Sequence, residues 1–105
     1  MTDRFGLKEE TISEIQQVFA TFPQVGKAII YGSRAKGTFK TGSDIDLTLV
    51  ADKKKQLDLT VQYQIEEALE ELMLPYQFDL SILETIENPN LLNHIKQVGL
   101  VFYAR

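Results

Sequence analysis

Apolar residues recur along the chain with two different periods, and each period predicts one kind of secondary structure. Steps of three and four residues mark amphipathic helices over residues 8–21 and 56–73, each of which is followed by a proline. A third, shorter helix is predicted between Asn88, a good N-cap that precedes a proline, and Gly99, a typical residue just past a helix end. The pattern thus places three helices along the chain.

Strands are marked by alternation with a period of two, or by a short apolar run between glycines. Residues 27–31 form such a run, residues 44–50 and 76–83 alternate apolar and polar side chains, and residues 100–103 offer a terminal strand. Strands and helices in this order predict an α+β fold, in which a small mixed β-sheet has helices packed mainly on one face. With 105 residues the chain fits one domain, which we expect to span residues 1–105.

Three aspartates lie on the polar faces of two predicted strands. Asp44 and Asp46 are two residues apart, so they point to the same side of a strand with their Cα atoms roughly 6.6 Å apart. Two such charges about 4 Å apart would repel by about 4 kcal/mol at an effective dielectric of about 20. A hard divalent cation such as Mg²⁺ would offset that repulsion, and Asp79 on the next strand can add a third carboxylate.

The segment between the first two strands has the opposite character. Residues 28–43 contain no acidic residue and combine glycines with cations. These glycines and cations are Gly32, Gly37, Gly42, Arg34, Lys36 and Lys40. Glycines let the backbone turn tightly and approach a ligand, and Ser33 with the amides that follow it can donate to phosphate oxygens. A basic loop before a carboxylate pair therefore indicates a site for a phosphate group bound together with a metal ion.

The spacing of these residues fits a known signature. The letters "GS" at 32–33, ten further residues and "DID" at 44–46 fit GSx10DxD, and "FDL" at 78–80 supplies the third carboxylate. On these motifs, and on "GSRAKG…SDIDL" as a whole, the chain resembles the DNA polymerase β-like nucleotidyltransferase superfamily, and in particular its minimal, MNT-type branch. The resemblance spans nearly the whole chain and implies a polymerase β-like nucleotidyltransferase fold.

The resemblance also implies a role for each matching residue. Asp44 and Asp46 would bind a pair of catalytic Mg²⁺ ions, and Asp79 would complete the metal-binding triad and activate the attacking hydroxyl. The implied nucleotide-binding residues are Gly32, Ser33, Arg34, Lys36 and Ser43. The implied reaction is in-line attack of a hydroxyl on the α-phosphorus of a nucleoside triphosphate, with ATP as the expected substrate and pyrophosphate as the leaving group.

A domain of this size has little surface left to recognise an acceptor, so we expect a second chain or a second copy to supply it. By resemblance, the partner would be a HEPN-type helical protein, and the chain would be the antitoxin of a toxin–antitoxin pair that adenylylates a tyrosine of its toxin. Two alternatives stay open at this point. One is a non-catalytic antitoxin or scaffold that neutralises its partner by binding, and the other is a nucleotidyltransferase that modifies a small molecule.

Composition narrows these possibilities. The chain has no cysteine, which excludes disulfides and thiolate metal sites, and its net charge of −4 argues against a nucleic acid as partner. No apolar run approaches the ~20 residues of a membrane span, and the N-terminus lacks the apolar middle of a signal peptide, so we expect a cytoplasmic protein.

His94 and Tyr31 are expected to be ordinary helix and strand residues without a role in the site.

Overall fold

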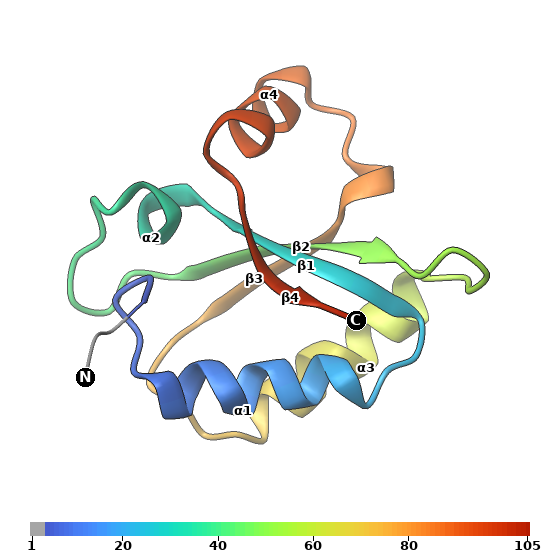
Figure 1. Ribbon diagram of the computed structural model, residues 1–105, viewed down its shortest axis with the longest axis horizontal. Helices are drawn as coiled ribbons and strands as arrows, with labels where there is room; N and C mark the ends of the chain where they lie inside the picture. The colour runs from blue at the N-terminus through green and yellow to red at the C-terminus, as the bar shows by residue number, and fades with distance from the viewer. Residues whose placement is uncertain (1–3) are drawn as a thin grey trace.

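A four-stranded mixed sheet forms the centre of the computed structural model, which describes residues 4–105 (Figure 1). Its strands are β1 (Val25–Tyr31), β2 (Ile45–Ala51), β3 (Phe78–Ile82) and β4 (Leu100–Ala104), in the spatial order β3-β2-β1-β4. Strand β1 runs antiparallel to both β2 and β4, whereas β2 and β3 run parallel to each other. Because β2 and β3 are parallel, both strands begin at the same edge of the sheet, although different segments of the chain lead into them.

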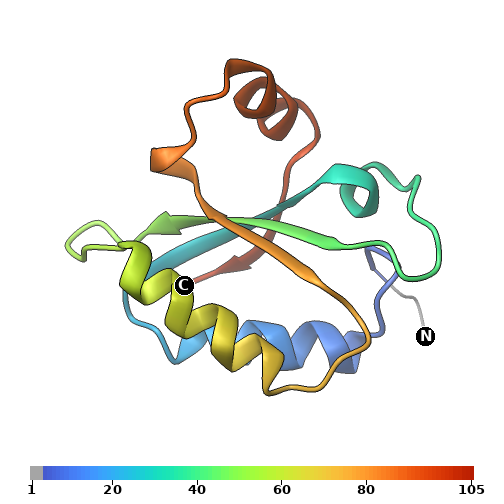
Figure 2. The same cartoon turned by 180° about the vertical axis from the view of Figure 1, so that it is seen from behind.

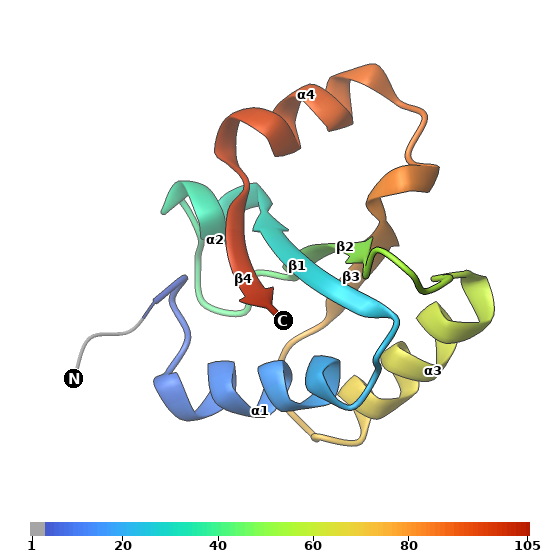
Figure 3. The ribbon, with the colours of Figure 1, turned by 45° about the vertical axis from the view of Figure 1, so that its right-hand side comes forward.

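The helices lie on both sides of this sheet, with the two long ones on the same face. They are α1 (Glu9–Ala20), α2 (Gly32–Lys36), α3 (Leu59–Glu70) and α4 (Pro89–Val98), and a short 3-10 turn, η1 (Leu83–Thr85), follows β3. Helices α1 and α3 cover one face, while α4 stands over the opposite face (Figures 1 and 2). Figure 3 shows α2 at the end of β1, beneath one end of α4. The predicted α+β class, with a small mixed sheet and helices packed mainly on one face, is confirmed.

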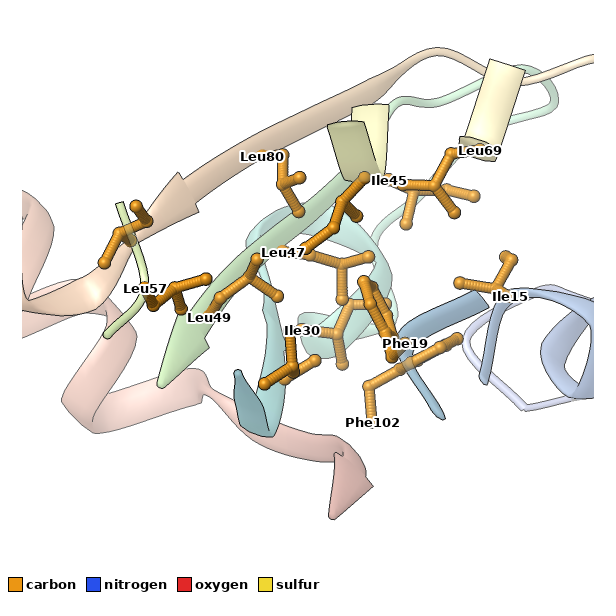
Figure 4. Close-up of a cluster of buried hydrophobic side chains, with 14 of the residues drawn as sticks. Ile15, Phe19, Ile30, Ile45, Leu47, Leu49, Leu57, Leu69, Leu80 and Phe102 are labelled. Carbon is orange, nitrogen blue, oxygen red and sulfur yellow. The ribbon is translucent and has the colours of Figure 1, made fainter. Parts of the chain in front are cut away.

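The core lies between the sheet and the two long helices. Alternate residues of β2, namely Ile45, Leu47 and Leu49, are completely buried there. They meet Ile15 and Phe19 of α1 and Leu69 of α3, together with further apolar side chains (Figure 4). Because side chains alternate along a strand, Asp46 and Thr48 must face the other way, toward the side on which α4 lies. The apolar stripe of β2 thus decides which face carries its aspartates.

Local signals explain most element ends. Asn88 caps α4 as predicted, because its side chain accepts hydrogen bonds from Asn90 N at 2.9 Å and Leu91 N at 3.3 Å. Helix α3 begins later than the apolar stripe suggested, since Asp58 accepts from Val61 N at 3.0 Å and fixes the start there. Residues 32–33 of the glycine-containing loop form the first turn of α2, a five-residue helix that is capped by Gly37 with φ +82°. None of the helices found within residues 4–105 is long and apolar enough to cross a membrane.

Candidate active site

Strand register brings two of the three predicted carboxylates side by side. In the parallel pairing of β2 and β3, Asp46 lies directly opposite Asp79, and in the antiparallel pairing of β1 and β2 it lies opposite Tyr31. Neighbouring strands are about 4.8 Å apart, so both side chains flank Asp46 on the same face of the sheet. Asp44 precedes β2 by one residue and is exposed. All three aspartates therefore gather where β2 and β3 begin.

The electrostatics of this edge are unfavourable for negative charge. Burial raises the pKa of Asp46 above its ordinary value, and the charges of Asp79 and Asp44 raise it further, whereas His94 and Arg34 act in the opposite direction. A cation placed between the carboxylates would relieve this repulsion. The available ligands are carboxylate oxygens, which Mg²⁺ prefers, so the chemistry of the site fits the predicted ion.

The three carboxylates are neighbours without forming a finished cage. No three acidic or histidine side chains are grouped as ligands of one ion in the described part of the chain, residues 4–105. Asp44 and Asp79 are exposed. Asp46, which pairs in register with Asp79, is half-buried. Mg²⁺ usually keeps several water ligands and is completed by substrate phosphates, so an open arrangement suits this ion better than a closed one would. The metal-binding triad remains a prediction.

Gly32 ties the glycine turn to the aspartates. Its φ of +74° is in the left-handed region, and a Cβ added at this position would collide with Asp46 Oδ2 and lie 3.1 Å from Asp46 Cγ. Only a residue without a side chain lets the backbone pass this close to the carboxylate. The ten-residue spacing between the "GS" and "DID" motifs therefore has a direct structural counterpart, because the two motifs touch.

Arg34, predicted to contact phosphates, is held by backbone carbonyls in the structure. The side chain is only 3% exposed. Its guanidinium donates to Ser43 O at 3.1 and 2.8 Å, to Phe5 O at 2.9 Å and to Gly6 O at 3.4 Å. A guanidinium has five N–H groups in a fixed fork, so one side chain can hold several carbonyls at once. These contacts make Arg34 a residue that fastens the loop, and its predicted contact with a phosphate remains a prediction.

Aromatic rings complete the surroundings of Arg34. Its Cζ lies 4.9 Å from the ring centroid of Tyr76 and 5.4 Å from that of Phe39, which is a cation–π arrangement on two rings. Ser43, the residue just before Asp44, is held from both sides, because its carbonyl accepts from Arg34 and its Oγ accepts from Lys40 N at 2.8 Å. The loop is thereby closed onto itself, and Lys36 and Lys40 stay exposed.

Three further features of the site were missed by the sequence patterns. Tyr31 is 6% exposed, and burial together with the charges of Asp79 and Asp46 raises its pKa, while a hydrogen bond with Ser81 acts in the opposite direction. Ser81 Oγ in turn donates to Thr48 Oγ1 at 2.9 Å. Ser81 and Thr48 follow the two aspartates by two residues, so alternation along the strands could have identified them.

No pattern in the sequence could have identified His94 as a neighbour of the glycine turn. Its Nε2 accepts a hydrogen bond from Gly32 N at 3.2 Å, and its ring lies edge-on to that of Tyr31, with centroids 6.1 Å apart. The contact joins residues 62 positions apart in the sequence. It depends on how α4 packs over the sheet, which no local pattern records.

Comparisons with known proteins agree with this geometry. A family model described as "Polymerase beta, Nucleotidyltransferase" matches residues 13–105. A crystal structure of a toxin–antitoxin with AMP-PNP is similar at 21% identity and a TM-score of 0.68, over 94% of this chain and 75% of that one. No curated protein matches the chain in sequence.

Two other solved structures have the same fold. A tri-AMPylated HEPN toxin in complex with its MNT antitoxin, from Shewanella oneidensis, matches at 16% identity and a TM-score of 0.65, over 92% of this chain and 72% of that one. A putative nucleotidyltransferase from Sulfolobus solfataricus matches at 18% identity and a TM-score of 0.51, over 95% and 92% of the two chains. At these identities the likeness concerns the fold.

Proposed function

Because the chain belongs to the polymerase beta nucleotidyltransferase family, we propose that it is a Mg²⁺-dependent enzyme that transfers AMP from ATP to a hydroxyl group of a partner protein. The observation that carries this proposal is the contact between the two motifs. Asp46 lies in register with Asp79 and against the backbone of Gly32, so carboxylates for a metal ion and a turn for a nucleotide share one edge of the sheet.

In this proposal Asp44, Asp46 and Asp79 would hold Mg²⁺, and Asp79 would also face the acceptor hydroxyl. When bound, Mg²⁺ would neutralise the negative charge on the attacking and leaving oxygens. Asp79 is exposed at the rim of the site, where its carboxylate takes the proton of the acceptor hydroxyl. The new bond joins the acceptor oxygen to the α-phosphorus, the bond to the β-phosphate oxygen breaks, and pyrophosphate leaves with its electron pair.

The nucleotide side of the site is assigned to Gly32, Ser33 and Lys36. Gly32 lets the backbone pass close to Asp46, because it has no side chain there. Lys36 is an exposed cation on the same short helix. Ser43 and Arg34 contribute indirectly, because they close the loop that leads into Asp44. A nucleotide held here would place its phosphates between the basic loop and the carboxylates.

The acceptor is proposed to be a hydroxyl, a tyrosine in particular, of a HEPN-type toxin, which would make this chain its antitoxin. Support comes from the neighbouring structures, which include a toxin–antitoxin solved with AMP-PNP and an AMPylated HEPN toxin bound to its MNT antitoxin. A partner is also expected from size, because the described residues leave little surface beyond the site to recognise a large acceptor.

The test is transfer of labelled AMP. The purified chain is incubated with Mg²⁺, α-labelled ATP and the HEPN-type protein proposed as its partner, and label on the partner is detected on a gel and located by mass spectrometry. Asp46→Asn and Asp79→Asn should abolish labelling. Asp52→Asn is the matched control, because Asp52 follows the far end of β2 and accepts from Lys53 N at 2.9 Å through an oxygen that asparagine retains.

The outcomes separate the candidate functions. Label on the partner that depends on Asp46 and Asp79 supports the transfer reaction. Neutralisation of the partner without label, and unchanged in both variants, would instead identify a binding-only antitoxin. Label that appears on a small alcohol and never on the protein would move the acceptor to that class.

A further inference from the structure

One side chain of α4 touches the turn that shapes the site. Gly32 N donates to His94 Nε2 at 3.2 Å, and the His94 ring meets Tyr31 edge-on with an interplanar angle of 81°. An imidazole nitrogen accepts a hydrogen bond through its lone pair, so Nε2 is the acceptor side of the His94 ring in this contact. His94 therefore touches both residues at the junction of β1 and α2.

The helix that carries His94 is fixed against the sheet. Ile95, the next residue, is 5% exposed. Gly99, which ends α4, passes so near β1 that an added Cβ would lie 2.8 Å from Ile29 Cγ2. The end of α4 therefore lies directly against β1, five residues after the side chain that contacts Gly32.

Gly32 is in turn the residue that limits where the Asp46 carboxylate can lie. Its backbone passes against Asp46, and its amide has His94 as its hydrogen-bond acceptor. Movement of this peptide would change the space open to the carboxylate. The chain of contacts therefore runs from α4 through His94 and Gly32 to Asp46.

We propose that His94 is a positioning residue of the transfer site, which holds the Gly32 peptide against Asp46 and so sets the affinity of the site for Mg²⁺ and nucleotide. The inference rests on the proposed function for its consequence, and on the Gly32 contact for its mechanism. His94 contacts neither ion nor substrate in this role. Partners that orient a metal-binding carboxylate affect affinity although they are not ligands themselves.

Two variants separate the hydrogen bond from the ring. His94→Gln keeps an acceptor, since its amide oxygen can receive the Gly32 N–H, whereas His94→Phe keeps a ring beside Tyr31 and removes the acceptor. Asn93→Gln is the matched control, because Asn93 is the exposed neighbour on the same helix. Circular dichroism and melting temperature verify that each variant folds.

The first readout needs no catalysis. In the free protein, the Gly32 amide is followed by nuclear magnetic resonance and hydrogen exchange, and calorimetry measures binding of a non-hydrolysable ATP analogue with Mg²⁺. For His94→Phe we expect faster exchange at Gly32 and an analogue dissociation constant raised about 3- to 10-fold, the effect of one lost neutral hydrogen bond. His94→Gln should restore most of both, and Asn93→Gln should match the parent.

The second readout is the transfer reaction, in which the KM for ATP should rise in His94→Phe while kcat changes less. Unchanged Gly32 exchange and analogue affinity in His94→Phe would overturn the inference, as would a His94→Gln variant no better than His94→Phe. A parent protein that binds the analogue and transfers nothing would refute the proposed function alone, because the affinity series still decides the role of His94. A parent that binds no nucleotide refutes both.

Discussion

Replacement of Gly32 by alanine tests whether contact between the two motifs builds the site. Gly32 has φ +74°, and its Cβ would collide with Asp46 Oδ2. Gly37, the C-cap of the same short helix, is a matched control, since it has φ +82° and an added Cβ there would meet no atom within 4 Å. Both changes therefore impose the same backbone strain, and only Gly32→Ala pushes on a proposed metal ligand.

The magnitudes follow from these two terms. An L-residue in the left-handed region costs about 1–2 kcal/mol, which both variants bear. In Gly32→Ala the Asp46 carboxylate must also turn away, and an off-rotamer side chain costs about 0.5–1.5 kcal/mol more. Each kilocalorie lowers the melting temperature of a domain near this size by about 4–8 °C. A catalytic group misplaced by about 1 Å can lose about 100-fold in rate, so activity should respond far more than stability.

The assay compares both variants by thermal melting and by the rate of AMP transfer. We expect Gly37→Ala to melt several degrees lower and to keep a rate near that of the parent, measured well below both melting temperatures. Gly32→Ala should melt at a similar or somewhat lower temperature and lose about 100-fold in kcat/KM. Equal rates in the two variants would refute the reasoning, because the collision with Asp46 would then have no chemical consequence.

Three further predictions concern charge. Below pH 3.8, the ordinary pKa of aspartate, Asp46→Asn should match the parent in stability. As pH rises it should become the more stable of the two, because the raised pKa of Asp46 means that the ionised carboxylate opposes folding. Melting curves across pH check this, and a difference in melting temperature that widens toward acid would contradict it. Arg34→Lys should lower the free energy of unfolding by about 1–3 kcal/mol in urea titrations, since an ammonium cannot reach all the carbonyls that the guanidinium holds. Lys36→Gln should raise the KM for ATP a few-fold at low salt and less at high salt, whereas Lys40→Gln should change it less; equal effects would remove the special role of Lys36.

Periodicity predicted the sheet and its two faces because the face on which a side chain lies depends only on its position along its own strand. Once Ile45, Leu47 and Leu49 are committed to the core, the side on which Asp46 lies is fixed, and the same holds for Asp79 beside Leu80. The signature spacing then indicated which turn accompanies the aspartates. These features needed no knowledge of how distant segments pack.

Contacts between segments distant in sequence could not be obtained in this way. Arg34 lies in a basic, glycine-rich loop of the kind that binds phosphates, which is all that the sequence indicates. Its hydrogen bonds to the carbonyls of Phe5 and Ser43 appear only in the folded structure. His94 likewise lies in a helix whose sequence says nothing of Gly32. A cation or histidine in a sequence has no assigned partner, and its role depends on which backbone groups the tertiary structure leaves for it.

Strand β2 divides stability and chemistry between its two faces. Its core residues are buried among apolar side chains, while its other face carries Asp46 at the open end and the buried Thr48 further along, which accepts from Ser81. Further along this face, Thr48 and Ser81 are neutral and hydrogen-bonded to each other, whereas Asp46 and Asp79 lie near the end where β2 and β3 begin. There, burial raises the pKa of Asp46, and the charges of Asp79 and Asp44 raise it further. A bound cation would remove this repulsion, and the same interaction that prepares the proposed reaction would then also stabilise the fold.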